Sequence, residues 1–241
     1  MCTVSLIYTK DANFFLTSNR DEAPNREAIH PQFYTHQNVD MCFPMDKQSK
    51  GTWVGISNQN RVVCLLNGGF EIHQRKTSYR LSRGVIVKNV LALNSIEDLE
   101  KVNLENIEPF TMVIADWNNA LIFKELVFDG EKAHIKNLEL NNHIWSSSTL
   151  YNSYQKAERQ RWFSDFKNEN DLTPQTLLRF HKTAGLEHEA FGVIMNRDHV
   201  KTTSITQIIK EDDVMSVSFS DLNTNKNTKL KFETYATLNE S

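Results

Sequence analysis

The sequence has few cysteines, and their spacing does not suit a framework. Cys2, Cys42 and Cys64 are the only three, and no two of them form a CxxC pair. An odd number without that spacing argues against structural disulfides and against a thiolate zinc site. His30 and His36 lie six residues apart with no further cluster of ligand residues. We therefore expect reduced thiols, no metal and no cofactor.

Long apolar runs and basic runs are missing as well. No stretch approaches the roughly 18 uninterrupted apolar residues of a membrane-spanning helix, and the N-terminus lacks the basic-then-apolar pattern of a signal peptide. The 27 basic and 30 acidic residues give a net charge of −3, without the basic, aromatic-rich run that tracks a phosphate backbone. We expect a soluble, cytoplasmic protein with a small-molecule substrate or ligand, no nucleic-acid partner and no stable membrane insertion. No pattern predicts a particular oligomeric state.

Nothing in the sequence divides the chain into parts. No internal repeat, linker or low-complexity tract interrupts the 241 residues, of which 39% are hydrophobic. A chain of this length and composition can bury a substantial core. The prediction is one domain that spans residues 1–241.

Strand patterns dominate, with helical patterns between them. Alternating apolar residues and turn residues predict strands at 3–9, 14–18, 51–57, 61–67, 110–117, 120–128, 133–140, a short one from 143, 191–195, 200–209, 214–222 and 229–235. Helical spacing and capping residues predict helices at 78–93, from 95, at 153–168 and at 174–182. The polar stretch 23–50 is predicted to be a long loop. The fold class that fits is α+β, with two stacked sheets and helices on their outer faces.

The first twenty-two residues contain the strongest candidate for chemistry. If Met1 is removed, Cys2 carries a thiol and a free α-amine, whose pKa of roughly 7.7–8.0 lets it act as a base near neutral pH. The hairpin that follows would return the chain to its starting end, beside Cys2. Its second strand is followed by Asn19-Arg20-Asp21-Glu22.

A second candidate corner is Asn67-Gly68-Gly69. Two glycines after a buried strand permit a positive φ and a close backbone approach, as an oxyanion-binding or substrate-binding corner requires. The alternative is a plain strand end that turns into a loop. The three serines at 146–148 are assigned to a turn or cap, and His181 and His188 to surface or capping positions.

Five motifs together resemble the NRDE family, which includes the transport and Golgi organisation protein 2 group. They are Met1-Cys2, Asn19-Arg20-Asp21-Glu22, Gly51-Thr52-Trp53-Val54-Gly55, Leu65-Leu66-Asn67 and Ser82-Arg83-Gly84. The resemblance implies the four-layer αββα architecture of N-terminal-nucleophile hydrolases. The beginning also resembles the cysteine branch that contains penicillin V acylases and bile-salt hydrolases.

The resemblance implies roles for individual positions. Cys2 matches the nucleophile, Arg20 the support of its thiolate and Asp21 the support of its amine, while Asn67 is a candidate oxyanion donor. Asn19, Glu22 and Gly68 are the remaining candidates for substrate binding near these residues. Ser147 stands where an asparagine is expected, with Asn152 as a possible substitute, and Thr203 stands where a late arginine is expected. A hydroxyl is a shorter donor than an amide, and a lost guanidinium removes a charge.

Two functions from different classes remain open at this point. The first is hydrolysis of an amide-type C–N bond in a small acylated substrate, with Cys2 as nucleophile. The second is non-enzymatic binding or handling of haem or of an acyl-thioester lipid, which family-level associations suggest.

Overall fold

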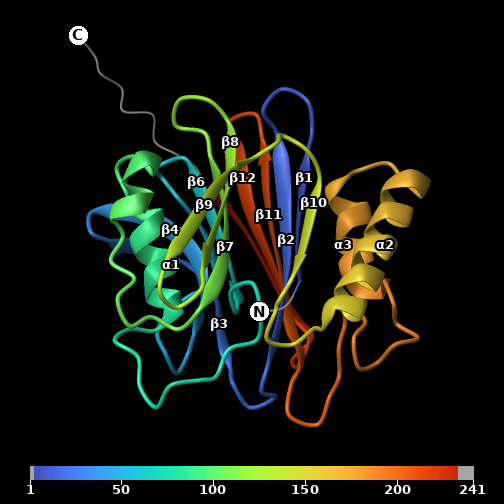
Figure 1. Ribbon diagram of the computed structural model, residues 1–241. Coiled ribbons are helices and arrows are strands. Elements are labelled where there is room, and N and C mark those ends of the chain that lie inside the picture. Colours follow the sequence, from blue (N-terminus) through green and yellow to red (C-terminus); the bar gives the residue numbers. More distant parts are fainter. Residues whose placement is uncertain (1–2, 233–241) are drawn as a thin grey trace.

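Two antiparallel β-sheets stack at the centre of the molecule, and helices cover their outer faces (Figure 1). The computed structural model describes residues 3–232. The first sheet has the strand order β10 (His143–Ser146), β1 (Thr3–Tyr8), β2 (Phe14–Glu22), β11 (Lys201–Glu211), β12 (Val214–Asp221) and β13 (Lys226–Phe232). The second sheet runs in chain order through β3 (Ala28–His36), β4 (Val39–Asp46), β5 (Val54–Ser57), β6 (Arg61–Asn67), β7 (Phe110–Asp116), β8 (Ile122–Phe128) and β9 (Ala133–Leu138).

The central core lies between the two sheets. Because successive side chains of a strand point to opposite faces, every second residue enters this core. Val4 and Leu6 of β1 and Leu16 of β2 meet Val62 and Cys64 of β6 there, all fully buried. The intervening residues of the first sheet point away from the second sheet, toward the helices.

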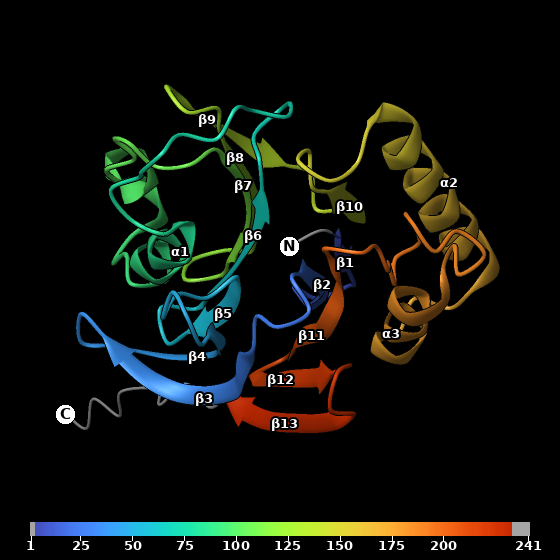
Figure 2. The same ribbon diagram turned by 90° about the horizontal axis from the view of Figure 1, so that it is seen from below.

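Helices form the two outer layers. The helix α1 (Arg83–Leu91) and the short 3-10 helix η1 (Ile96–Lys101) pack on the second sheet, whereas α2 (Ser153–Glu169) and α3 (Pro174–Thr183) pack on the first. Figure 2 shows the helices on opposite sides of the sheet pair. The predicted four-layer αββα sandwich is confirmed. Each helix begins at a residue whose side chain accepts a backbone N–H, namely Ser82, Ser95, Asn152 and Thr173.

Two parts of the sequence prediction were wrong. The stretch 23–50 contains the hairpin of β3 and β4 rather than a long loop. β3 is an edge strand in which the polar residues Gln32 and Thr35 are exposed, and Pro31 lies at an irregularity in its pairing between Ile29 and Gln32. A proline and polar residues are tolerated on such an edge, and they also resemble a loop in sequence.

The predicted strand at 191–195 is also absent from the described chain, where only an isolated bridge joins Asn196 to Lys201. The predicted turn at 223–227 ends earlier than expected, because β13 begins at Lys226. Positions 233–235 of the last predicted strand lie outside the described residues. Within residues 3–232, none of the helices has both the length and the apolar character needed to cross a membrane.

Candidate active site

The Asn19-Arg20-Asp21-Glu22 motif lies inside β2 rather than after it. Consecutive strand residues point to opposite faces, so Arg20 points toward the second sheet and Asp21 toward the helices. The pairing of Thr3 with Asn19 on one side and with Ser146 on the other places the beginning of β1 beside this motif. Cys2 itself lies outside the described residues.

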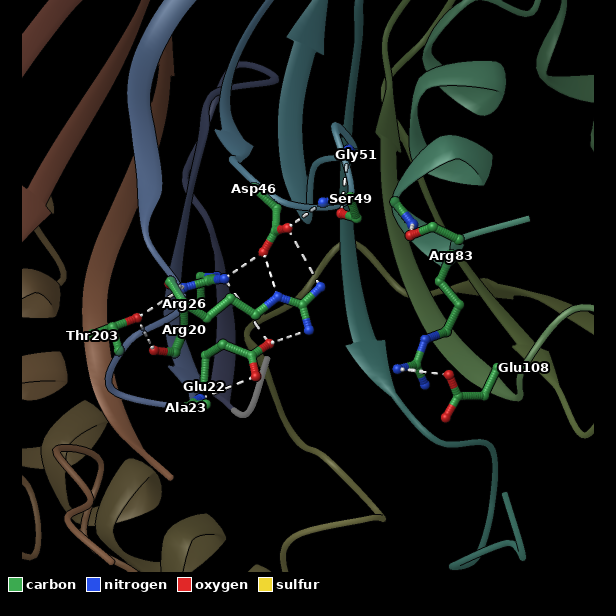
Figure 3. A network of polar contacts seen from close by, with 12 residues as sticks. Arg20, Glu22, Ala23, Arg26, Asp46, Ser49, Gly51, Arg83, Glu108 and Thr203 are labelled. Atoms are coloured by element: carbon green, nitrogen blue, oxygen red, sulfur yellow. Dashed lines mark hydrogen bonds and ion pairs between the residues drawn. The ribbon is translucent and has the colours of Figure 1, made fainter. Parts of the chain in front are cut away.

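Arg20 is the centre of a buried network of charges (Figure 3). Its Nη2 lies 2.6 Å from Oδ2 of Asp46, and its guanidinium carbon lies 4.7 Å from the centre of the Trp53 ring. Arg26 shares Asp46, with Nε at 2.8 Å from the same oxygen, and also lies 3.4 Å from Glu22. Burial lowers the pKa of Arg20, and the nearby carboxylates of Glu22 and Asp46 partly offset this decrease.

Asp46 is held ionised although burial opposes its charge. The backbone N–H of Ser49 donates to it at 2.8 Å, and this bond together with Arg26 keeps the pKa of Asp46 below its ordinary value. Sequence reasoning missed this carboxylate because it placed the segment in a loop. The signal was available in the short apolar run from Met41 to Met45 within β4, of which most side chains are buried.

At a β-bulge in β11, Thr202 contacts Asp21 on one face of the first sheet and Thr203 contacts Arg20 on the other. Thr202 pairs with Asp21 and Ser204 with Arg20, so Thr203 is the extra residue. The Thr203 hydroxyl donates to the Arg20 carbonyl and accepts from Arg20 Nη1, both at 3.1 Å. The resemblance implies an arginine at position 203, but Thr203 instead forms hydrogen bonds with Arg20.

Asp21 is buried on the helix side and accepts two hydroxyl hydrogen bonds. Tyr151 donates to Oδ2 at 2.8 Å and Thr202 donates to Oδ1 at 2.6 Å. Arg159 of α2 stacks on the Tyr151 ring, with 3.6 Å between the guanidinium carbon and the ring centre. These bonds fix the orientation of the carboxylate beside the beginning of β1.

Behind Asp21 lies a polar network that the sequence did not predict. Arg159 is fully buried and donates to the hydroxyl of Thr3 and, at 2.7 Å, to the carbonyl of Gly192. His181 was assigned to a surface or capping position, and this prediction was wrong. It is fully buried, and its ring nitrogens lie 2.7 Å from Asn19 Oδ1 and 2.9 Å from the Ser5 hydroxyl.

The environment of His181 keeps its ring neutral. Burial, with a smaller contribution from Arg159, lowers the pKa of His181 to about 3. The Asn19 amide nitrogen donates to the carbonyls of His181 and Val193 at 3.0 and 2.6 Å. Asn19 is fully buried and therefore joins β2 to α3. His188 was assigned in the same way, and its side chain is about one third exposed and stacks on Trp162.

The two sheets are joined at the same end by serine hydroxyls. Ser147 donates to the carbonyl of Asn67, and Ser148 donates to the carbonyl of Gly69, both at 2.7 Å. Gly68 has φ +87°, and a Cβ there would lie 2.3 Å from the Ser148 hydroxyl. The close approach thus excludes any larger residue at this position.

Two further motifs of the sequence contact each other directly. A Cβ on Gly51 would lie 2.8 Å from Cα of Gly84, and a Cβ on Gly84 would lie 2.8 Å from the backbone nitrogen of Thr52. That nitrogen donates to the Gly84 carbonyl at 3.2 Å. The glycines of Gly51-Thr52-Trp53 and Ser82-Arg83-Gly84 therefore allow the start of α1 to pack against the loop before β5.

These elements surround a cavity of about 360 Å³, which we call the first cavity. Its charged lining consists of Arg20, Glu22, Arg26, Asp46, His73, Arg75, Arg83 and Glu108, and Trp53, Asn67 and Thr149 also line it. An adjacent second cavity of about 750 Å³ has a more apolar lining that includes Phe70, Ile72, Leu150 and Tyr151. The two cavities share Ile72 and Thr149.

The structure brings only part of the predicted set to these cavities. Arg20, Glu22 and Asn67 line the first cavity, and Asn152 lines the second, where it also caps α2. Asp21 and Ser147 are buried next to the cavity walls through the bonds given above. Sequence reasoning did not single out Asp46, Glu108, Tyr151 or Arg159, because nothing in the local pattern marks residues that meet only across layers.

Comparison with known proteins supports the fold and identifies a family profile. The family described as Transport and Golgi organisation 2 matches residues 1–237. No curated protein sequence matches the chain.

Two solved structures resemble the chain in fold. A Caenorhabditis elegans N-acylethanolamine-hydrolyzing acid amidase ortholog is 10% identical, with a TM-score of 0.59 over 86% of this chain and 92% of that one. A variant of conjugated bile acid hydrolase from Clostridium perfringens is 11% identical, with a TM-score of 0.52 over 95% of this chain and 92% of that one. Both are N-terminal-nucleophile hydrolases, so the predicted fold is confirmed.

Proposed function

Because the chain belongs to the Transport and Golgi organisation 2 family and has the N-terminal-nucleophile hydrolase fold, we propose that it hydrolyses an amide-type C–N bond in a small acylated substrate. The nucleophile in this proposal is the thiol of Cys2 after removal of Met1. The observation that carries the proposal is the place of the beginning of β1. It lies between β2 and β10 at one end of the first sheet, and at this end Arg20 of β2 and Asn67 of β6 line the first cavity.

The pattern of β1 supports a thiol on the cavity side. Val4 and Leu6 face the second sheet, as Arg20 does. Cys2 lies outside the described residues, and the proposal requires its thiol on this same face. In the proposal, the positive charge of Arg20 lowers the pKa of the thiol, and Asp21 holds the α-amine from the opposite face.

The reaction proceeds in two balanced steps. The α-amine takes the thiol proton, the thiolate forms a C–S bond to the carbonyl carbon, and the π electrons move to the oxygen, which the Asn67 amide and a backbone N–H stabilise. When this intermediate collapses, the C–N bond breaks and the leaving nitrogen takes the proton from the amine. Water then forms a C–O bond to the acyl carbon, the C–S bond breaks, and the thiol regains a proton.

The test compares wild type with Cys2→Ala on acylated amino acids, lactones and acyl-thioesters. We expect turnover by wild type, none by Cys2→Ala, and an acyl adduct on Cys2 in the intact mass of wild type trapped during turnover. Circular dichroism of both proteins controls for folding.

Two outcomes would contradict the proposal. One is Met1 retained in protein purified from its native cell, since an acylated nitrogen cannot act as the base. The other is turnover of the same substrates by Cys2→Ala at the wild-type rate. Stoichiometric binding of haem with a Soret shift, without cleavage of any amide, would favour the handling function instead.

A further inference from the structure

One wall of the first cavity holds two guanidinium groups that are paired with two carboxylates. Arg20 and Arg26 share the carboxylate of Asp46, and Glu22 lies 3.4 Å from Arg26 and 3.9 Å from Arg20. Arg26 is about one third exposed, whereas Arg20 is buried. The outer face of the Arg26 guanidinium is thus the accessible part of this wall, and Figure 3 shows it pointing into the space opposite α1.

The facing wall has two guanidinium groups and one histidine around one carboxylate. Glu108 lies 3.2 Å from Arg83, 3.6 Å from Arg75 and 3.5 Å from His73. Arg83 also donates to the carbonyl of Pro109 at 3.1 Å. Burial lowers the pKa of Arg83, because its charge is only partly compensated by Glu108.

The two walls together leave an excess of positive charge. Four guanidinium groups line the first cavity with only three carboxylates, even when His73 is counted as neutral. Partly buried guanidinium groups gain most from planar or tetrahedral oxyanions, which accept paired N–H bonds. A cavity with this lining favours an anion and disfavours a cation.

The second cavity has a different character. Phe70 and Ile72, which line it, are large apolar side chains that are 58% and 75% exposed. Leu150 and Tyr151 extend the apolar surface inward. Ile72 and Thr149 line both cavities, so one ligand can contact the two linings at once.

We propose that the two cavities form one binding site for an anionic amphipathic substrate, an inference that rests on the hydrolase function proposed above. The oxyanion, a carboxylate, sulfonate or phosphate, lies between Arg26 and Arg83 in the first cavity. The acyl chain lies against Phe70 and Ile72 in the second cavity. The scissile bond then lies between Asn67 of the first cavity and Thr149, which lines both cavities.

The first experiment measures binding to Cys2→Ala, so that cleavage does not interfere. N-dodecanoylglycine and N-dodecanoylethanolamine have the same chain, but only the first is an anion. Calorimetric titration is expected to show at least about tenfold tighter binding of the glycine conjugate, with the preference weakened at high salt. N-dodecanoyltaurine and dodecyl phosphate distinguish the three oxyanions. Equal affinity for the anionic and the neutral ligand would overturn the proposal.

Variants test each half of the site with a matched control. Arg83→Gln is expected to abolish the preference for the anion, whereas Arg80→Gln is expected to keep it. Arg80 carries the same charge three residues away and donates to the carbonyls of Asn103 and Glu105 outside the first cavity. Ile72→Ser is expected to weaken dodecanoyl ligands more than hexanoyl ones. Equal losses in Arg83→Gln and Arg80→Gln would refute the assigned anion site.

The readout separates this inference from the hydrolase proposal. Tight, anion-selective binding without cleavage by wild type would contradict the hydrolase function and support the site. Cleavage of the neutral and anionic substrates with equal kcat/KM would support the hydrolase function and overturn the site.

Discussion

The three cysteines are expected to differ sharply in reactivity toward an alkylating agent. Cys42 on β4 and Cys64 on β6 both belong to the second sheet and are fully buried in the central core, and burial raises the pKa of each thiol to about 12. Near pH 7.5, such a thiol is ionised in about 3 molecules per 100,000, whereas a thiol with an ordinary pKa of roughly 8.5 is ionised in about 9%. Because the thiolate is the reacting species, the difference in rate is about 3,000-fold before burial is considered.

The assay is a time course with iodoacetamide, followed by digestion and mass spectrometry of each cysteine peptide. In native protein Cys2 is expected to react at least about 1,000 times faster than Cys42 or Cys64. The substitution Cys2→Ala should remove the fast phase and leave the slow one unchanged. In guanidinium chloride all three thiols should react at similar rates, which controls for the sequence around each of them.

Two results would refute this reasoning. Modification of Cys42 or Cys64 in native protein as fast as in the unfolded chain would show that these side chains do not lie in the core between the two sheets. Modification of Cys2 as slowly as the two buried thiols would contradict its assignment as an activated nucleophile.

The remaining predictions concern stability, measured by chemical denaturation. The folded protein keeps His181 neutral down to about pH 3, whereas the unfolded chain protonates it below about pH 6.5. Stability should therefore fall by about 2–3 kcal/mol between about pH 6.5 and 4.5, and His181→Gln should lack this part of the slope; equal slopes would contradict it. Gly84→Ala should destabilise by about 1–3 kcal/mol, because its Cβ would clash with the Thr52 backbone, although alanine normally favours a helix; a gain in stability would refute the contact. Tyr151→Phe should cost about 1–2 kcal/mol by removing one hydroxyl bond from buried Asp21, and an unchanged midpoint would show that this bond contributes nothing.

Much of the fold could be predicted because its strands carry clear local patterns. The hairpins of β1–β2, β5–β6 and β7–β8 have alternating apolar residues and polar turns, and the helices have good caps. The hairpin of β3 and β4 has no such clear local pattern. An edge strand with Pro31 and exposed polar residues has the same composition as a loop, and only pairing with its neighbour makes it a strand.

The candidate site was predictable only where its residues are close in sequence. Arg20 and Asp21 were found as a motif, but their separation onto opposite faces follows from the continuation of β2 to Glu22. Asp46 and Arg83 reach the first cavity from different elements. Arg159 and His181 lie at helical spacing from the buried apolar residues of α2 and α3, but charged and titratable side chains are ordinarily expected at the surface, so the pattern alone did not mark them as buried.

The bulge at Thr203 has a consequence for how the gene can vary. An in-frame deletion of this one codon would restore regular pairing between β11 and β2 and remove the hydroxyl that bonds to Arg20, while Thr202 kept its place opposite Asp21. A substitution such as Thr203→Ser keeps both the length and the hydroxyl. In a library of one-residue deletions and substitutions along β11, the effect of deletion should therefore differ most from the effect of substitution at this codon. Such a library would map this wall of the site without a known substrate.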